Sequence, residues 1–175
     1  SEDTAMADGQ ALDMIAMSAA QCASRLAFFR IAFGLGGGEK DTITTDELKA
    51  LVVNFVQGGR VSVVWTAQNA RIDLNAGKIV LNLCLIGAES LPRGGVLRVD
   101  VAEIGGRLGF AVSAQGVGAS LRPGMDDALM AKTEADMLNV RTVHGYFTVI
   151  LAAASEAQLE FSSAGDDEIN LAALL

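Results

Sequence analysis

The stretch KIVLNLCLIGAESLPRGG, residues 78–95, is the most informative part of the sequence. From Ile79 to Ile86 it is apolar almost all round, which is typical of a helix buried on both sides. The motif Pro92-Arg93-Gly94-Gly95 then has the composition of a turn. The stretch therefore predicts a central buried helix over residues 73–91, followed by a turn into the next element.

Segments on both sides of this helix predict the rest of an α/β domain. Thr44 and Glu47 have the spacing of a capping box, which predicts a helix that ends near Phe55. This order of elements is typical of an α+β fold, in which helices cover one face of a mixed sheet. Strands are predicted over residues 61–65, 96–103, 107–114, 157–162 and 168–174, and helices near 125–131 and 139–154.

A long helix is predicted over about residues 5–33, ahead of this domain. Its apolar and small residues alternate at spacings of three and four, which is the heptad pattern of a coiled coil or four-helix bundle. One helix cannot bury such a seam alone, so we expect pairing between subunits as a homodimer. Packing on the chain's own globular part is the alternative. The seam residues are Leu12, Ile15, Ala19, Cys22, Leu26, Phe29 and Phe33.

A glycine cluster separates the long helix from the domain. Gly34, Gly36, Gly37 and Gly38 predict a helix end and a flexible joint. We therefore expect a helical dimerisation segment over residues 1–36 and an α/β domain over residues 42–175.

Composition argues against several classes of function. The chain of 175 residues has a formal net charge of −8, which disfavours binding to nucleic acid or to an anionic membrane. No apolar run reaches the roughly 20 residues that cross a bilayer, and no signal peptide is recognisable, so we expect a cytoplasmic protein. A single histidine, His144, and two distant cysteines, Cys22 and Cys84, predict no metal site and two buried, reduced thiols.

The segment NLCLIGAESLPRGGVLRVDV, residues 82–101, and the order of elements resemble the ATP-binding domain of histidine kinases and their GHKL relatives. In that family a second asparagine on the buried helix holds magnesium, and an aspartate ahead of two glycines binds adenine. Asn82 matches the first asparagine, but Ile86 stands at the metal position and Ala114 at the aspartate. Isoleucine offers no oxygen ligand and alanine no acceptor, so the resemblance implies a degenerate domain without a nucleotide cofactor.

Other positions of the kinase pattern also depart from it. We expect Gly116 and Gly118 to form a turn rather than a phosphate loop, and Asn82 to be buried and hydrogen-bonded. Met137-Leu138-Asn139-Val140 stand where the lid glycines should be. An acidic group nearby is expected to be a solvated surface; it comprises Asp126, Asp127, Glu134 and Asp136.

The motif RLAFFRIAFG, residues 25–34, followed by the glycine joint and the degenerate domain, resembles the ChpT-type histidine phosphotransferases. The resemblance implies a two-helix hairpin that pairs into a four-helix bundle and relays phosphoryl groups between response-regulator receivers, through a histidine on its first helix. The long helix would be the second helix, and the phosphoacceptor is expected upstream of Ser1. His144 has no acidic sequence neighbour to orient it, and a structural or partly exposed histidine is expected.

The leading hypothesis is a dimeric histidine phosphotransferase that does not use ATP. No residue of this chain is expected to be catalytic, so enzymatic activity of the 175 residues themselves stays open. Arg25 and Arg30 flank the seam and are candidates either for receiver contact or for simple solvent exposure. The alternative function is a non-catalytic dimeric docking or scaffold protein for signalling partners, whereas a working kinase or ATPase is disfavoured.

Overall fold

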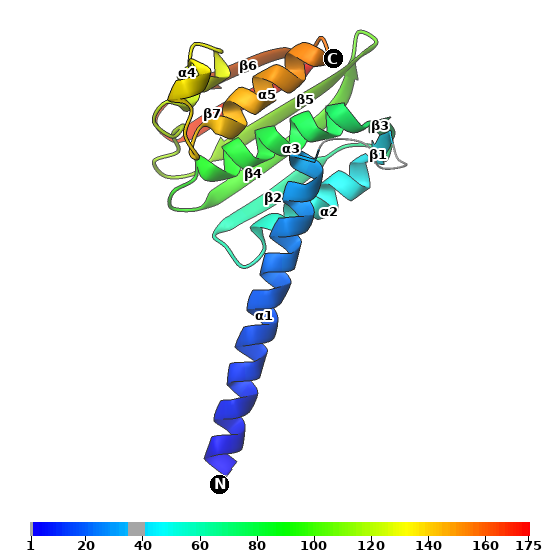
Figure 1. The fold of residues 1–175 in the computed structure, drawn as a ribbon. Coiled ribbons are helices and arrows are strands. Elements are labelled where there is room, and N and C mark those ends of the chain that lie inside the picture. Colours follow the sequence, from blue (N-terminus) through cyan, green and yellow to red (C-terminus); the bar gives the residue numbers. More distant parts are fainter. Residues whose placement is uncertain (1, 35–40) are drawn as a thin grey trace.

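The structure, a computed structural model, describes residues 2–34 and 41–175, apart from the side chains of residues 2–8 and 135. A long helix projects from an α/β sandwich (Figure 1). The helices are α1 (Glu2–Ala32), α2 (Thr45–Val56), α3 (Leu74–Glu89), α4 (Met125–Leu129) and α5 (Val143–Ala154), with a 3-10 turn at Ala135–Met137. The strands are β1 (Thr42–Thr44), β2 (Val61–Thr66), β3 (Arg71–Asp73), β4 (Gly95–Ile104), β5 (Arg107–Gln115), β6 (Gln158–Ser163) and β7 (Glu168–Leu174).

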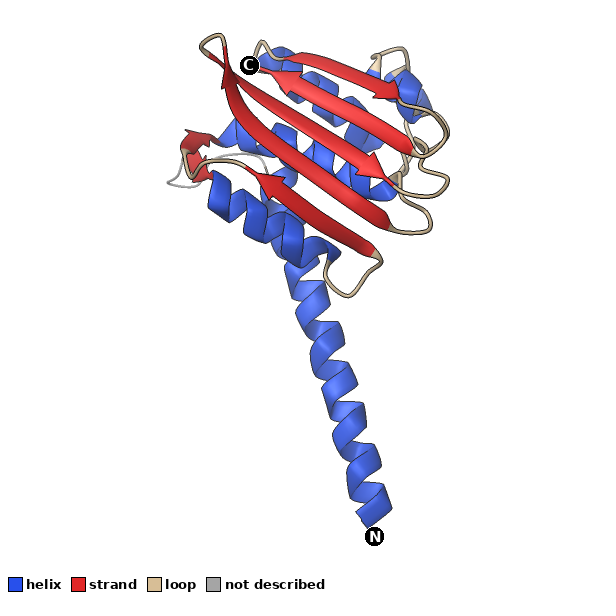
Figure 2. Ribbon diagram, turned by 180° about the vertical axis from the view of Figure 1, so that it is seen from behind, coloured by secondary structure: helices blue, strands red, loops and turns tan. Residues whose placement is uncertain are grey.

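Most strands of the described residues form one mixed sheet with the order β2-β4-β5-β7-β6. β2 is parallel to β4, whereas the other neighbours are antiparallel. Helices cover one face, and the opposite face is open (Figure 2). Burial alternates accordingly along β7, where Ile169, Leu171 and Ala173 point into the core. The α+β fold with helices on one face of a mixed sheet is therefore confirmed.

Local capping sets the start of two helices. The Thr44 hydroxyl accepts a hydrogen bond from the Glu47 amide at 3.1 Å, and the Glu47 carboxylate accepts one from the Thr44 amide at 2.8 Å. This reciprocal pair confirms the predicted capping box and starts α2 at Thr45. Asp73 caps α3 through its side chain alone, since its carboxylate accepts hydrogen bonds from the Asn75 and Ala76 amides.

The clearest differences between the predicted elements and the structure concern α5 and the pair β1 and β3. α5 begins at Val143 rather than near 139, because the Asn139 side chain accepts a hydrogen bond from the Arg141 amide and forms a turn there first. β1 and β3 pair with each other and were not predicted, since three residues are too few to show alternation. The glycine joint beyond Gly34 lies outside the described residues, so the predicted division at residues 36–42 stays a prediction.

α3 is the centre of the domain. Every residue from Ala76 to Gly87 is buried, which confirms a helix enclosed on both sides. Gly87 allows α3 to lie close to the sheet, since a β-carbon there would come within 2.8 Å of Leu97 Cδ1 and 3.2 Å of Val112 Cγ1. The central helix and the sheet therefore form one tightly packed layer pair.

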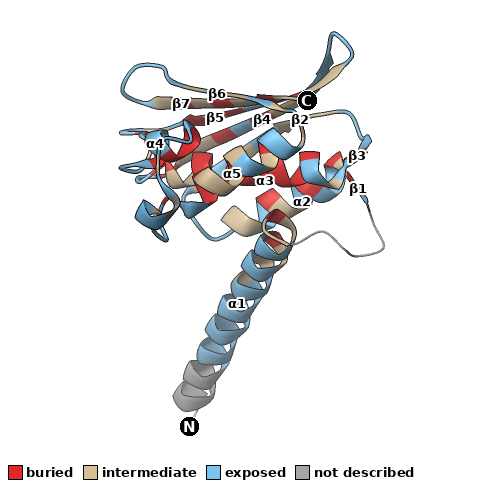
Figure 3. Cartoon of the chain, turned by 45° about the horizontal axis from the view of Figure 1, so that its top comes forward, coloured by how far each residue is buried: buried red, intermediate tan, exposed pale blue. Residues whose placement is uncertain are grey.

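The last turns of α1 belong to the core of the domain. Phe28 and Ala32 are both fully buried, and the Phe28 ring stacks on Phe55 of α2 with centroids 4.3 Å apart. The Asn82 amide of α3 donates a hydrogen bond to the Ala32 carbonyl at 3.1 Å. Figure 3 shows the contrast with the rest of α1, which is exposed along almost its whole described length. The helix is thus anchored at one end and bare at the other.

Replacing Phe28 with alanine is expected to lower the free energy of unfolding by about 3–5 kcal/mol, because it removes a fully buried ring and leaves a cavity. Leu26→Ala is the matched control, since Leu26 is 68% exposed, and its effect should stay within about 0.5 kcal/mol. Urea denaturation of dilute, monomeric protein, followed by Trp65 fluorescence, measures both. Equal losses in the two variants would contradict this account of how α1 is anchored.

Candidate functional site

Both positions that carry nucleotide ligands in the kinase pattern lie in the hydrophobic core. Ile86 is 1% exposed and Ala114 is fully buried, in one cluster with Met125 of α4. A β-carbon on Gly87 would lie 3.7 Å from the Ala114 β-carbon, which is ordinary van der Waals contact. The direction in which an adenine-binding aspartate would point from position 114 is therefore occupied by α3, and neither side chain can act as a polar ligand.

The Gly116-Val117-Gly118 segment is a turn, as predicted. The Gly118 amide donates a hydrogen bond to an Asp167 carboxylate oxygen at 2.7 Å, and the Gly116 amide donates one to the Asp167 carbonyl at 3.0 Å. Gly118 has a φ of +73°, which favours glycine. Two amides that a phosphate loop would offer to an anion are thus held by Asp167, a partner too distant in sequence to be found from a motif.

Asn82 is fully buried and hydrogen-bonded, as predicted. Its amide nitrogen donates to the Lys78 carbonyl at 2.9 Å and to the Ala32 carbonyl at 3.1 Å. The second contact satisfies a carbonyl at the C-terminal end of α1, where helical partners run out. The residue that matches a kinase ligand therefore joins two helices here.

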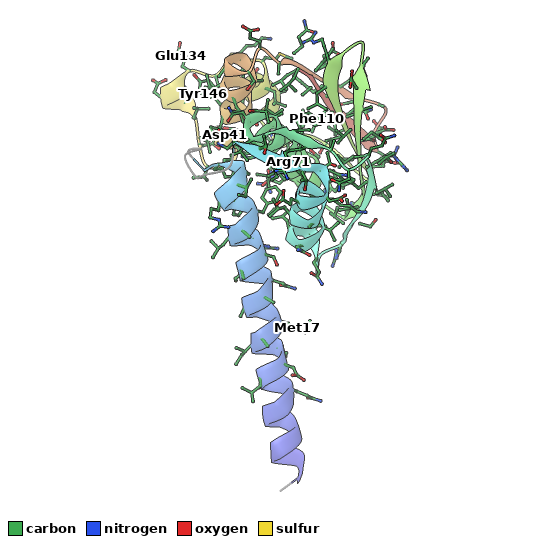
Figure 4. The ribbon with its side chains drawn as sticks, turned by 90° about the vertical axis from the view of Figure 1, so that its right-hand side faces the viewer. Met17, Asp41, Arg71, Phe110, Glu134 and Tyr146 are labelled. Carbon is green, nitrogen blue, oxygen red and sulfur yellow. The ribbon has the colours of Figure 1, made fainter. Side chains whose placement is uncertain are left out.

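The predicted seam lies on the side of α1 that faces away from α2, and its first five residues are exposed to solvent. The side chains of Leu12, Ile15 and Leu26 are 66%, 65% and 68% exposed, and Ala19 and Cys22 are exposed as well. Met17, on another side of α1, also projects into open space at 64% exposure (Figure 4). The chain's own domain leaves these residues uncovered.

The C-terminal end of the seam, at Phe29 and Phe33, lies against the α/β domain instead. The Phe29 ring contacts Phe28, Phe33 and Phe55, and the Phe33 ring lies 5.6 Å from Phe147 of α5. Phe29 is still 37% exposed. These two residues therefore connect the bare seam with the α/β domain.

The two cysteines differ from one another. Cys84 is buried in α3, and burial raises the pKa of its thiol, so it stays protonated. The prediction that Cys22 is also buried is wrong within the chain, because α2 packs on the opposite side of α1 and leaves Cys22 exposed. Both thiols are free.

The charged candidates on the surface are solvated. Arg25 and Arg30 are exposed on α1. The acidic group around α4 is exposed too, as predicted, at Asp126, Asp127, Glu134 and Asp136. Across residues 2–34 and 41–175, no three His, Cys, Asp or Glu side chains gather as metal ligands would. No helix within these ranges combines the length and apolarity that a membrane span requires.

A cleft of about 400 Å³ lies where α1, α3 and α5 meet. Six of its lining side chains are apolar, three of them phenylalanines, and two are polar. Neither Ile86 nor Ala114 lines it, whereas Val140, from the segment at the lid position of the kinase pattern, does. The lining residues are Phe29, Phe33, Leu85, Glu89, Val140, Val143, His144 and Phe147.

His144 lies at the polar end of this cleft. Its side chain is 7% exposed, and its Nε2 atom is 2.9 Å from Glu89 Oε2, although neither atom makes a hydrogen bond of acceptable geometry. Arg122 lies on the other side of the carboxylate, with Nη2 3.5 Å from Glu89 Oε1. His144 thus has an acidic neighbour in space that its sequence neighbours did not reveal. A buried histidine beside a carboxylate agrees with the predicted structural role.

Placing an aspartate at position 114, where the kinase pattern has its adenine ligand, is not expected to give nucleotide binding. Ala114→Asp should lower the free energy of unfolding by about 3 kcal/mol or more, because it buries an unpaired carboxylate, and should not create ATP binding. Ala111→Asp, on the exposed face of the same strand, is the control and should cost about 1 kcal/mol or less. Denaturation and calorimetric titration with magnesium-ATP measure both quantities. Saturable nucleotide binding by the first variant would refute the account of a closed pocket.

Comparison with known structures places the fold among histidine kinases and phosphotransferases. A bacterial phosphotransferase structure superposes with a TM-score of 0.83 at 24% identity, over 95% of this chain and 80% of that chain. The histidine kinase domain of the Erythrobacter litoralis EL346 blue-light activated kinase gives a TM-score of 0.58 at 16% identity, over 95% of this chain and 85% of that chain. At these identities the similarity shows a shared fold.

Sequence comparison identifies the family. The protein phosphotransferase ChpT of Brucella abortus (strain 2308) is 25% identical over 161 residues, which cover 92% of this chain and 77% of that protein. A family model described as the histidine phosphotransferase C-terminal domain matches residues 45–167. This match spans most of the chain and all elements from α2 to the turn before β7. The chain therefore belongs to the histidine phosphotransferase family that this C-terminal domain defines.

Proposed function

We propose that the protein is a histidine phosphotransferase of a two-component phosphorelay, which passes phosphoryl groups between response-regulator receivers without using ATP. The proposal rests on two features that occur together in this chain: a kinase-like domain with apolar nucleotide positions, and a helix with an exposed apolar seam. The domain has the fold of a kinase but buries Ile86 and Ala114 at the nucleotide positions, and it anchors a helix whose apolar seam is bare. A partner that already carries phosphate replaces ATP as the donor.

The phosphoacceptor is proposed to lie on a helix upstream of Ser1. Phosphoryl transfer needs an imidazole nitrogen that attacks an aspartyl phosphate while the carboxylate leaves, so the histidine must be open to a receiver. His144 does not meet this requirement, because its side chain is 7% exposed and its Nε2 atom faces Glu89. Its burial supports a carrier elsewhere.

The bare seam supports a homodimer in which α1 is the second helix of a hairpin. Pairing of two hairpins would cover Leu12, Ile15, Ala19, Cys22 and Leu26, which water otherwise contacts, in a four-helix bundle. In this arrangement residues 1–36 form the dimerisation segment. Residues 42–175 form a domain that does not bind nucleotide. Arg25 and Arg30, exposed beside the seam, are proposed contacts for acidic receivers.

The seam can be tested with a single charge. Ile15→Asp is expected to weaken the dimer at least tenfold, because Ile15 is 65% exposed in the single chain and its burial between subunits would be lost. Ala20→Asp, on the other side of α1, is the control and should leave the dimer intact. Sedimentation equilibrium gives the mass of each variant, and circular dichroism checks that α1 remains helical. A dimer of unchanged affinity in Ile15→Asp would contradict the proposed seam.

Reconstitution tests the phosphorelay itself. A protein that includes the residues encoded upstream of Ser1 is expected to take radiolabelled phosphate from a phosphorylated receiver and pass it to a second receiver. It should not become labelled from magnesium-ATP alone. His144→Gln in the same protein should keep the transfer, since His144 is buried. If receivers bind but no phosphate moves, the non-catalytic docking function replaces this proposal.

A further inference from the structure

The central helix α3 carries its buried polar residues on the side where α1 ends. Within residues 76–87, all of which are buried, Lys78 and Asn82 are polar and the others are apolar or glycine. The two are four residues apart and therefore lie on the same side of α3, one turn from each other. The hydrogen bond from Asn82 to the Ala32 carbonyl shows that this side faces the last turn of α1. The polar part of the core thus coincides with the joint between α1 and the domain (Figure 1).

The orientation of the Asn82 amide follows from its two partners. Both are carbonyl oxygens, those of Lys78 at 2.9 Å and Ala32 at 3.1 Å. A carbonyl can only accept, so the amide nitrogen must face them. The Oδ1 atom of Asn82 is buried, and no donor within residues 2–34 and 41–175 reaches it. A buried acceptor without a donor lowers stability, so another side chain would make this part of the core more stable.

Asn82 contributes direction to the joint instead. The other contacts of the last turns of α1 are apolar, since Phe28 stacks on Phe55 and Ala32 lies in the same hydrophobic cluster. Hydrophobic burial is non-directional and tolerates small changes in the angle between α1 and α3. A hydrogen bond weakens steeply once its geometry departs from the optimum. The bond from Asn82 to Ala32 therefore favours one angle among those that the apolar contacts allow.

The angle of α1 affects the surface that the proposed function assigns to receivers. Arg25 lies three residues before the buried Phe28, or about 4.5 Å along the helix axis. Arg30 lies between Phe28 and Ala32 in the sequence, and both arginines are exposed. A globular partner that contacts these arginines therefore also meets the α/β domain. The angle between α1 and the domain sets the shape of this combined surface.

We propose that Asn82 is a positioning residue for phosphoryl transfer. Its hydrogen bond to Ala32 holds α1 at one angle to the domain and thereby shapes the surface on which a receiver docks. The inference rests on the proposed function, because the receiver and its phosphate belong to that function. Asn82 is fully buried and touches neither of them.

Spin labels test the angle in the 175-residue chain itself. They are attached through Met17→Cys on α1 and Val64→Cys on the open face of the sheet, with Cys22→Ser to remove the exposed thiol. Double electron–electron resonance on dilute, monomeric protein gives the distribution of the distance between the labels. Asn82→Leu keeps the branching of the side chain but cannot donate, and we expect it to broaden this distribution about twofold. An unchanged distribution would overturn the proposal.

Asn82→Ala and Cys84→Ala form a matched pair in case the leucine packs poorly. Each removes a buried side chain from α3 and should lower the midpoint of urea denaturation. Cys84 lies two residues after Asn82 and therefore points to nearly the opposite side of the helix. Only Asn82→Ala should broaden the distance distribution. Equal broadening in both variants would show a general loss of packing and overturn the proposal.

Transfer kinetics test the consequence for function. In the protein that includes the residues encoded upstream of Ser1, Asn82→Leu should raise the KM for a phosphorylated receiver about tenfold. Its kcat should change by less than about twofold, because the docking surface is altered and the reacting imidazole is not. An unchanged KM, or a loss confined to kcat, would contradict the positioning role. If the unaltered protein transfers no phosphate, the proposed function fails, and the distance measurement still decides whether Asn82 fixes α1.

Discussion

The anchoring of α1 in the domain is the interaction on which the rest of the structure depends. Phe28 and Ala32 are part of the same hydrophobic cluster as the central helix α3, and Asn82 satisfies a carbonyl at the end of α1. Without this joint, the chain would be a free helix tethered to an α/β domain. With it, the direction of α1 is set by the domain, and the cleft beside Phe29 and Phe33 exists because two packed bodies meet there.

The two positions at which the kinase pattern places nucleotide ligands belong to the hydrophobic core in this chain. Ile86 and Ala114 do not leave a vacant site, since Gly87 brings α3 directly against Ala114 and the core extends to Met125. The glycine turn is likewise held from within the chain, because the Gly118 and Gly116 amides donate hydrogen bonds to Asp167. Apolar side chains at these positions can be buried without the cost that an unpaired polar ligand would carry there.

The sequence predicted those features whose signals are local or strictly periodic. The capping box of Thr44 and Glu47 is complete within four residues, and the apolar run of α3, broken only by Asn82, is typical of a buried helix. The heptad pattern predicted a seam through Leu12, Ile15 and Leu26, and within the single chain these three residues are exposed. It could not show that Phe28 rather than Phe29 is the fully buried ring, because both are apolar and α2 decides between them. The Glu89–His144 and Asp167–Gly118 contacts join distant segments, and no motif encodes them.

The packing of the last turns of α1 in the domain core also has a mechanical consequence. A helix of 31 residues is about 46 Å long at roughly 1.5 Å per residue, and its buried residues, among the side chains described from residue 9 on, lie near its C-terminal end. It therefore acts as a lever: a rotation of about 5° at the aromatic joint displaces the far tip by about 4 Å, close to the diameter of a methyl group. Small changes in side-chain packing around Phe33 and Phe147 would be magnified into a change of register wherever the tip is in contact with another molecule.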